Sequence, residues 1–284
     1  MTFVQAMLLA ILQGVSELFP VSSLGHTVIV PALLHWRVDR SAPSFLAFVV
    51  ALHLGTALAL VVFYRREWLA IVRGLARSLL RGRIGDDPEE RIGWLLVAGT
   101  IPVGILGIFL EHPVRALFGS TATVAVFLVL NGGIMFLGER LRRAQRSGGG
   151  QSRPLQALSL GDAVKVGFAQ SFALLPGISR SGSSIVAGLL LDLDHADAAR
   201  YSFLLATPAI GAASLLEIPR LFAPDARGML GESFVGGIVA GVTAYASVAF
   251  LTRYFRSNDL RPFGWYCLIV GAGSLLLIAT KVIT

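Results

Sequence analysis

Long apolar runs constrain the fold of this chain more than any other feature of its sequence. Six runs lie close to the ~20 residues that an α-helix needs to cross a bilayer. They cover residues 44–64, 92–110, 121–138, 197–216, 233–252 and 262–281. Charged residues make up 14% of the chain, whereas soluble domains contain roughly 25%. The sequence therefore predicts an all-α integral membrane protein with six transmembrane helices.

Two polar stretches interrupt shorter apolar segments. Residues 13–26 read QGVSELFPVSSLGH, and residues 170–184 read QSFALLPGISRSGSS. Each stretch places proline, glycine and serine between two apolar pieces that are too short to span a bilayer. A broken helix at membrane depth is tolerated only where protein or water covers its backbone. We therefore expect two re-entrant broken-helix hairpins, at residues 1–35 and 159–192, in addition to the six spans.

The two stretches share a pattern that predicts an inverted-topology repeat. The residues that match when one position is inserted are Gln13, Pro20 and Ser23 in the first stretch, and Gln170, Pro176 and Ser179 in the second. Three spans follow each hairpin, and because three is odd the second copy should be inverted. Within a single membrane domain of residues 1–284, the repeats cover residues 1–138 and 159–284, joined by a cytoplasmic linker at 139–158. The two breaks are then expected to meet as halves of one site.

The distribution of arginine predicts the orientation in the membrane. Segments 65–91 and 139–158 contain seven and five arginines, whereas 111–120 contains only Arg115. The positive-inside rule places the first two segments in the cytoplasm and the third outside. The basic residues that give the net charge of +7 are therefore expected beside anionic headgroups. No basic patch interleaved with aromatic residues indicates nucleic-acid binding. The single cysteine, Cys267, excludes a disulfide and a cysteine-based metal site.

Glu17 is the only carboxylate among the first 38 residues. An ionisable side chain at membrane depth is costly and indicates a functional site. Gln13 lies four residues earlier, on the same helical face. The two side chains offer oxygen ligands to a divalent cation such as Mg²⁺ or Ca²⁺. The alternative is a glutamate at a helix end that bonds only to the backbone at the break.

Ser22, Ser23 and His26 follow the break at Pro20 and are expected at the start of a helix. Free N–H groups and a partial positive charge make such a helix start suitable for phosphate oxygens. Ser23, with a histidine three residues later, fits a nucleophile and its acid or base. The alternative is a serine N-cap beside a histidine that reaches toward the membrane surface.

Arg180 stands among serines and glycines in the second stretch. Its planar guanidinium matches phosphate oxygens, and glycine lets the backbone approach an anion closely. The expected phosphate-binding residues are Ser22, Gly177, Ser179, Arg180, Ser181, Gly182 and Ser184. The alternative is that Arg180 pairs with Glu17 for structural reasons only, which also brings the breaks together.

These residues together indicate a site for the phosphate or diphosphate of a membrane lipid. Two classes of function fit: an enzyme that cleaves a lipid phosphoanhydride, and an inverted-repeat transporter or flippase of a phosphorylated lipid. A carrier needs only the arginine and the helix dipoles. The set of Glu17, Ser23 and His26 therefore favours an enzyme.

The motifs resemble those of bacterial undecaprenyl-diphosphate phosphatases. QGVSELFPVSSLGH is similar to their E/Q-x-x-x-E and PVSSxGH signature, LLPGISRSGSSI to their PGxSRSGxxI signature, and YSFLLATP at 201–208 to a third segment. The resemblance implies hydrolysis of undecaprenyl diphosphate to undecaprenyl phosphate and inorganic phosphate. It also implies a multi-pass protein of the bacterial plasma (inner) membrane with its active site on the periplasmic side. The product is the lipid carrier of peptidoglycan synthesis, so the implied roles include cell wall biogenesis, cell shape and bacitracin resistance.

The resemblance also implies roles for single residues. Glu17 and Gln13 would assist a divalent cation and water, Ser23 would be the nucleophile or orient a water, and His26 would be the acid or base. Arg180 would hold the phosphates. Gln13 stands where many relatives have glutamate, which weakens its role as a metal ligand. The implied partners are the polyprenyl diphosphate substrate and membrane lipids. A homodimer is the only protein assembly that we consider.

Overall fold

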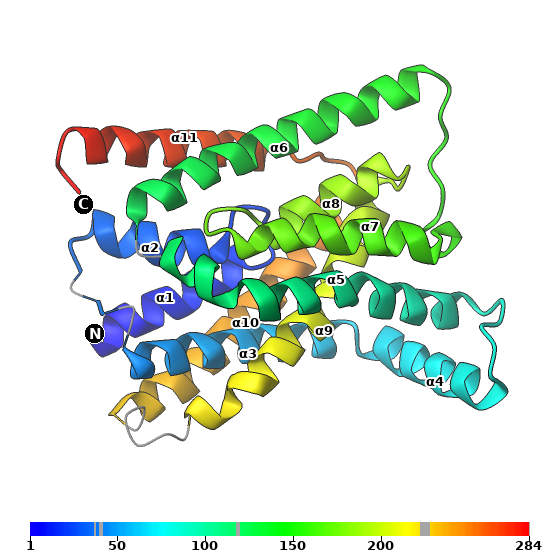
Figure 1. Cartoon of the computed structure of the whole chain (residues 1–284), viewed down its shortest axis with the longest axis horizontal. Helices are drawn as coiled ribbons and strands as arrows, with labels where there is room; N and C mark the ends of the chain where they lie inside the picture. Colours follow the sequence, from blue (N-terminus) through cyan, green and yellow to red (C-terminus); the bar gives the residue numbers. More distant parts are fainter. Residues whose placement is uncertain (37, 40–41, 118–119, 222–227, 284) are drawn as a thin grey trace.

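The computed structural model describes residues 1–36, 38–39, 42–117, 120–221 and 228–283, with the backbone alone at 111–116, 216, 220 and 221. Within these residues the chain is helical and forms no strand. Figure 1 shows long helices running roughly side by side, with both chain ends at one end of the molecule. The all-α prediction is confirmed for the described part of the chain.

In the described part of the chain, five helices are long and apolar enough to cross a membrane. They are α3 (Pro43–Phe63), α5 (Pro88–Leu117, apolar over Pro88–Leu110), α6 (Thr121–Ser147), α10 (Leu230–Tyr254) and α11 (Arg261–Ala279). The sixth predicted span, 197–216, lies in α9 (His195–Leu221), which is a helix but is not one of these five. A multi-pass membrane protein is therefore supported, while the sixth crossing stays a prediction.

Two pairs of short helices occupy the predicted hairpins. The first pair is α1 (Phe3–Ser16) and α2 (Ser23–Leu33), and the second is α7 (Leu160–Ser171) and α8 (Arg180–Leu190). The longest of them, α1, is about 21 Å long at ~1.5 Å per residue, which is short of the ~30 Å hydrocarbon core. Figure 1 shows the two pairs entering from opposite ends of the bundle, with their tips near its middle. A short 3₁₀ helix lies on either side of α7, at Leu155–Ala157 and Phe172–Leu174.

The same capping interactions begin the helices of both pairs. Thr2 and Ser159 each form a capping box with the residue three positions later, at the starts of α1 and α7. Ser22 and Ser179 each accept a hydrogen bond from the N–H of a glycine three positions later, at the starts of α2 and α8. A side-chain oxygen at this position satisfies a free N–H of the first turn. Local sequence therefore sets where all four helices begin.

These caps correct the register of the predicted repeat. The separation is 157 residues for Thr2 and Ser159, for Gln13 and Gln170, for Ser22 and Ser179, and for Gly25 and Gly182. The correspondence therefore needs no inserted residue, and Ser179 corresponds to Ser22 rather than to Ser23. Ser23 corresponds instead to Arg180, because each is the first helical residue after its cap. The match through Pro20 and Pro176 is wrong by one position.

Helices of each half of the chain pack mainly on helices of the other half. Helix α1 packs on α10, while α7, its counterpart, packs on α5. Helices α3 and α9 pack on each other, and so do α6 and α11. Most buried apolar side chains form one cluster around these contacts, with Tyr201 and Phe203 among its largest members.

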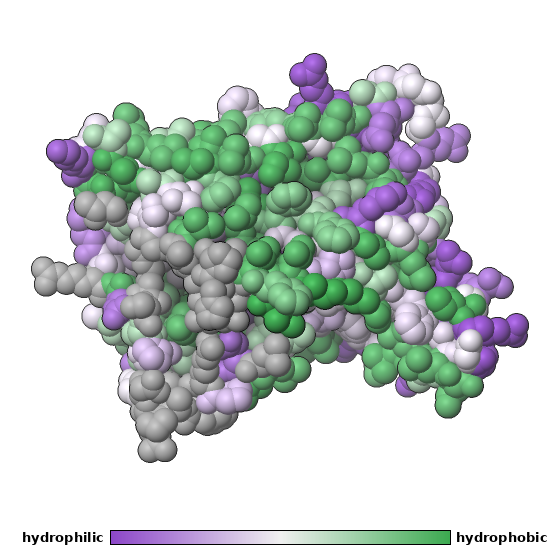
Figure 2. Space-filling view, viewed as in Figure 1, coloured by the Kyte–Doolittle hydropathy of each residue, from purple (hydrophilic) through white to green (hydrophobic). Residues whose placement is uncertain are grey.

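The arginine-rich segments are more helical than predicted. Helix α6 continues past the predicted boundary at residue 138 and ends at Ser147, so the first part of the predicted linker 139–158 is helical. Its sequence ERLRRAQRS consists largely of good helix formers, and Gly148 follows directly. Residues 65–81 form the amphipathic helix α4 (Arg65–Arg81). In Figure 2 the hydrophilic residues gather at the end of the molecule where α4 and α6 end, next to a broad hydrophobic band.

Candidate functional site

A cavity of about 340 Å³ lies where the tips of the two hairpins meet. Its polar lining includes Ser16, Glu17, Ser22, Ser23, His53, Gln170, Ser179, Arg180, Ser214 and Glu217. Apolar side chains of α3, α5, the α7–α8 connection and α9 complete the wall, among them Val49, Val103, Leu174 and Ile210. Residues from both polar stretches therefore share one cavity.

Glu17 lies at the end of α1 and receives hydrogen bonds from both hairpins. Ser23 Oγ donates to Glu17 Oε2 at 2.5 Å, and Gln13 Nε2 donates to the same oxygen at 3.1 Å. Arg180 Nη2 lies 3.5 Å from Glu17 Oε1. Glu17 is 8% exposed, and a buried carboxylate needs partners of this kind. A serine hydroxyl that donates to a carboxylate is the arrangement in which the serine can lose its proton.

Arg180, the first residue of α8, has an N–H donor without a hydrogen-bond partner among the described residues. Its side chain is 11% exposed, and Nη1 donates to the carbonyl oxygen of Ser202 at 3.2 Å. Among the described residues its Nε has no hydrogen-bond partner, although that atom is buried. A purely structural arginine–carboxylate pair is usually short and bidentate, whereas this one makes a single contact at 3.5 Å. A guanidinium with unused donors in a cavity is suited to bind an anion.

The two helix starts add N–H donors to the same cavity. Ser22 and Ser179 are the N-caps of α2 and α8, and both line the cavity with the residue that follows them. Ser22 has φ of 68°, a conformation that costs a non-glycine residue about 1 kcal/mol or more. Helix starts favour negative charge through their free N–H groups. The strained turn at Ser22 therefore places Ser23 at a positive helix end, facing Glu17.

The other predicted phosphate-binding residues contact the first break or neighbouring helices instead of lining the cavity. Ser181 Oγ donates to the carbonyl oxygen of Phe19 at 3.2 Å, and Ser184 Oγ lies 2.7 Å from Ser202 Oγ. Gly177 has φ of 110°, and a Cβ there would collide with the carbonyl oxygen of Val124. Gly182 packs against Pro20. None of these four predicted residues is part of the cavity wall.

His26 points away from the cavity. Its Nδ1 donates to the carbonyl oxygen of Ser22 at 2.7 Å, which leaves Nε2 to accept from the hydroxyl of Tyr266 at 2.7 Å. The ring stacks on that of Tyr266, and His26 is 2% exposed. The structure therefore does not bring His26 next to Ser23 and Glu17 within the cavity.

Among the described residues His53 is the histidine that lines the cavity, and sequence analysis assigned it no role there. Its Nδ1 donates to the carbonyl oxygen of Val49 at 2.9 Å, so Nε2 faces Glu17 Oε2 at 3.6 Å. Because 36 positions separate His53 from Glu17, no spacing rule connects them. The signal in the sequence was a lone ionisable residue inside an apolar span, which by itself marks a functional candidate.

Asn131 is a second residue that sequence analysis missed. Its Nδ2 donates to the carbonyl oxygen of Pro20 at 3.1 Å, and its Oδ1 accepts from the backbone N–H of Ser179 at 3.0 Å. Asn131 lies in α6 and is 1% exposed. One amide on a spanning helix thus joins the two breaks and fixes the distance between Glu17 and Arg180.

The donor set permits only a sparse metal site. Among the described residues no three histidine, cysteine, aspartate or glutamate side chains group together to hold a metal ion. Gln13 directs its amide nitrogen at Glu17, and Glu217 is the other carboxylate in the cavity. This set fits a cation such as Mg²⁺ that takes most of its ligands from water and substrate phosphates.

The chain is similar to known proteins over nearly its whole length. A family model described as "Bacitracin resistance protein BacA" matches residues 6–273. A protein of Chromobacterium violaceum named "Undecaprenyl-diphosphatase 2" is 49% identical over 280 residues, which cover 97% of this chain and 99% of the relative. "Undecaprenyl-diphosphatase" proteins of Acidiphilium cryptum and Mycobacterium avium are 51% and 45% identical, over 98% and 99% of this chain and 99% of each relative. The chain therefore belongs to the BacA bacitracin resistance protein family.

Proposed function

We propose that this protein hydrolyses undecaprenyl diphosphate to undecaprenyl phosphate and inorganic phosphate. The names of its full-length relatives support this proposal. One observation in the structure carries it. Ser23, Glu17 and Arg180 share a cavity, and the Arg180 Nε has no hydrogen-bond partner among the described residues. The reaction would recycle the lipid carrier of peptidoglycan synthesis and confer bacitracin resistance. Because the full-length relatives are named as diphosphatases, the transporter alternative is not favoured.

In the proposed mechanism Arg180 and the two helix starts bind the oxygens of the diphosphate. If Ser23 Oγ attacks the terminal phosphorus, Glu17 takes the Ser23 proton and a phosphoserine forms, which a water then hydrolyses to inorganic phosphate as Glu17 returns the proton to Ser23 Oγ. If a water attacks instead, Ser23 orients it and Glu17 takes the proton that the water loses. The bond from this phosphorus to the bridging oxygen breaks, and undecaprenyl phosphate leaves. Its phosphate carries the developing charge, so this step needs no strong general acid. A phosphoserine trapped by acid quenching distinguishes direct attack by Ser23 from attack by water.

The two histidines receive different roles in this proposal. His53 would stabilise the Glu17 carboxylate from the α3 side of the cavity when its Nε2 also carries a proton. His26 was predicted as the acid or base, and its contacts to Ser22 and Tyr266 support a role in holding the turn before Ser23.

We further propose a divalent cation, Mg²⁺ or Ca²⁺, held by Glu17 together with the substrate phosphates. Gln13 would align the Glu17 carboxylate through its amide N–H. Such a cation would neutralise phosphate charge.

We also propose six membrane crossings and two re-entrant hairpins, arranged as an inverted repeat over residues 1–138 and 159–284. The common caps of the four short helices and the exchanged packing of α1 and α7 support the repeat. The arginines of α4 and of the end of α6 lie at the hydrophilic end of the molecule (Figure 2). Their position supports a cytoplasmic location for that end, and with it a site open to the periplasmic side of the inner membrane. Ser120→Cys and Ser152→Cys variants test the orientation, since a membrane-impermeant thiol reagent should label only the first from outside. Labelling of the second alone would contradict it. A homodimer remains a prediction.

Phosphate release from a polyprenyl diphosphate by the purified protein is the decisive test of the function. We expect release that stops in Glu17→Ala and Arg180→Ala variants and that falls when EDTA is added and recovers with Mg²⁺ or Ca²⁺. Movement of the lipid across liposomes without phosphate release would instead support a transporter. Release that EDTA leaves unchanged would refute the metal and leave the phosphatase standing.

A further inference from the structure

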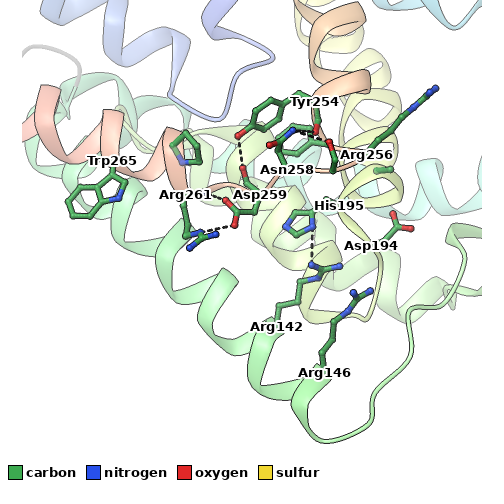
Figure 3. A pocket seen from close by; sticks show the side chains of 14 residues that line it. Arg142, Arg146, Asp194, His195, Tyr254, Arg256, Asn258, Asp259, Arg261 and Trp265 are labelled. Carbon is green, nitrogen blue, oxygen red and sulfur yellow. Dashed lines mark hydrogen bonds and ion pairs between the residues drawn. The ribbon is translucent and has the colours of Figure 1, made fainter.

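A second and larger cavity lies at the arginine-rich end of the bundle. It has a volume of about 950 Å³ and lies between the C-terminal part of α6, the start of α9 and the connection between α10 and α11 (Figure 3). None of its lining residues belongs to the cavity around Glu17. The arginine and aspartate side chains that line it are those of Arg142, Arg146, Arg256, Arg261, Asp194 and Asp259. Four arginines and two aspartates leave the wall with an excess of positive charge.

Among the described residues the aspartates attract Arg142 but form no direct ion pair with either arginine of α6. Arg261 Nε donates to Asp259 at 2.6 Å, so this aspartate already has a basic partner. Asp194 stands directly before α9 and accepts a hydrogen bond from the backbone N–H of Asp197 at 2.7 Å. Within the described part of the chain, neither Arg142 nor Arg146 forms an ion pair. Figure 3 shows these two side chains reaching from the same helix toward the start of α9, while Arg256 points elsewhere.

Arg142 is held in place by a chain of buried contacts. Its Nη1 donates to His195 Nδ1 at 2.9 Å, and His195 Nε2 donates to Glu139 Oε1 at 2.6 Å. The same oxygen of Glu139, which is 2% exposed, accepts from the backbone N–H of Leu260 at 3.0 Å. Arg146, one turn beyond Arg142, donates to the hydroxyl of Ser152. These bonds hold the Arg142 guanidinium in place before any ligand arrives, while Arg146 is exposed and bonds to Ser152.

Orientation in the membrane alone does not account for this arrangement. The positive-inside rule needs arginines near the membrane surface, but it does not need them fixed. Two like charges four residues apart on a helix also repel each other. The guanidinium groups of Arg142, held by His195, and of Arg146 form no direct ion pair among the described residues and line one large cavity. Such planar donors bind phosphate oxygens.

The surroundings of the cavity indicate that the phosphate belongs to a lipid. Trp265 lines the cavity, is 59% exposed, and lies near the start of the spanning helix α11. Tryptophan is enriched where membrane and water meet. On the same helix, Ile269 and Leu276 are 68% and 65% exposed and continue along the face below Trp265. A lipid with its headgroup in the cavity finds an apolar path for its chains along this face.

We propose that this cavity binds the phosphate headgroup of an anionic phospholipid from the surrounding bilayer. Arg142 and Arg146 contact the phosphate, Trp265 contacts the glycerol region, and the acyl chains lie along α11. The bound headgroup joins α6, α9 and the α10–α11 connection at the end of the molecule opposite the chain termini. Basic pockets between membrane helices are known to hold lipid headgroups of this kind.

Native mass spectrometry of the full chain, delipidated in a neutral detergent, tests the proposal. Phosphatidylglycerol is the probe, and phosphatidylcholine and inorganic phosphate are the comparison ligands. We expect saturable binding of phosphatidylglycerol that weakens about 30-fold in an Arg142→Gln, Arg146→Gln double variant. Binding of inorganic phosphate with the same affinity would refute a lipid site, and equal binding of phosphatidylcholine would refute recognition of charge.

A control with the same net charge separates the site from general attraction. Arg66 and Arg73 on α4 are exposed, line neither cavity and make no ion pair among the described residues. The Arg66→Gln, Arg73→Gln variant should therefore bind phosphatidylglycerol within about threefold of the parent protein, since distant exposed charges act weakly. A loss as large as that of the Arg142 and Arg146 variant would overturn the proposal.

A single substitution guards against misfolding. Arg146→Gln leaves the bond between Arg142 and His195 intact, so it should keep the circular dichroism and unfolding midpoint of the parent in the absence of lipid. We expect it to weaken phosphatidylglycerol binding about fivefold. Unchanged binding in this folded variant and in the double variant would refute the assignment.

Discussion

Substitutions of Arg180 and Glu17 can separate the contribution of this pair to stability from its contribution to catalysis. Arg180→Met removes the guanidinium but keeps a long side chain in the buried space. Breaking one half of a buried pair usually costs about 3–5 kcal/mol. The contact here is a single one of 3.5 Å, and Glu17 keeps Ser23 and Gln13 as donors. We therefore expect a loss near the lower end, about 3 kcal/mol.

Glu17→Gln added to Arg180→Met removes the stranded charge. Because replacing both members of a buried pair is often close to neutral, the double variant should return to within about 1 kcal/mol of the parent. Unfolding in mixed micelles with increasing SDS gives these free energies, and the coupling between the two changes follows from the double-mutant cycle.

Activity should not return with stability. Loss of one preorganised charge that stabilises a transition state lowers the rate about 100- to 1,000-fold, and Glu17→Gln removes the proposed base as well. Phosphate release from a polyprenyl diphosphate should therefore stay at least about 100-fold down in both the single and the double variants. A stable double variant that recovers a large part of the activity would refute the phosphate-binding role and leave Arg180 as a structural residue.

The ion pair between Arg200 and Glu67 is the matched control. Arg200 Nη2 donates to Glu67 at 2.6 Å, and neither residue lines the cavity. An Arg200→Met, Glu67→Gln variant should keep its activity within about threefold of the parent, since partly exposed ion pairs contribute little. A loss comparable to that of the Arg180 variant would show that the assay reports general damage to the fold.

Three further changes address single contacts. Ser23→Ala should lower kcat at least about 100-fold, whereas Ser22→Ala should mainly weaken a helix cap by about 1 kcal/mol; similar kinetics for the two would contradict the assignment of Ser23. His53→Ala should lower kcat, and His53→Gln, which keeps a neutral N–H donor, should recover part of it while KM stays nearly constant; unchanged kinetics in both would exclude His53 from the mechanism. Gly177→Ala should lower the free energy of unfolding by more than about 1 kcal/mol, because alanine is strained at φ of 110°. Its control is Gly133→Ala in α6, where a Cβ has open space and should be neutral or stabilising.

Much of the architecture followed from local pattern. The apolar runs predicted the long helices, and the positions of proline and serine predicted breaks where α1 gives way to α2 and α7 to α8. The sequence also predicted that Glu17, Ser23 and Arg180 share a site, and the structure places all three in one cavity. Glu17 and Arg180 stand out in the sequence because an ionisable group inside apolar sequence is rare unless it has a function. Pattern failed at boundaries such as residue 138, where arginine-rich sequence continues a helix as readily as it forms a loop.

By itself, then, the sequence determined a helical membrane protein with two polar breaks and an arginine-rich end. Tertiary structure decided which side chains meet at those breaks. Asn131 joins Pro20 and Ser179 across 111 and 48 positions, and Arg180 reaches Glu17 across 163. Tertiary structure also turned His26 toward Tyr266 and placed His53 beside the carboxylate. The physical reason is that spacing along a helix fixes only which residues share a face, whereas the packing of distant helices decides what that face meets.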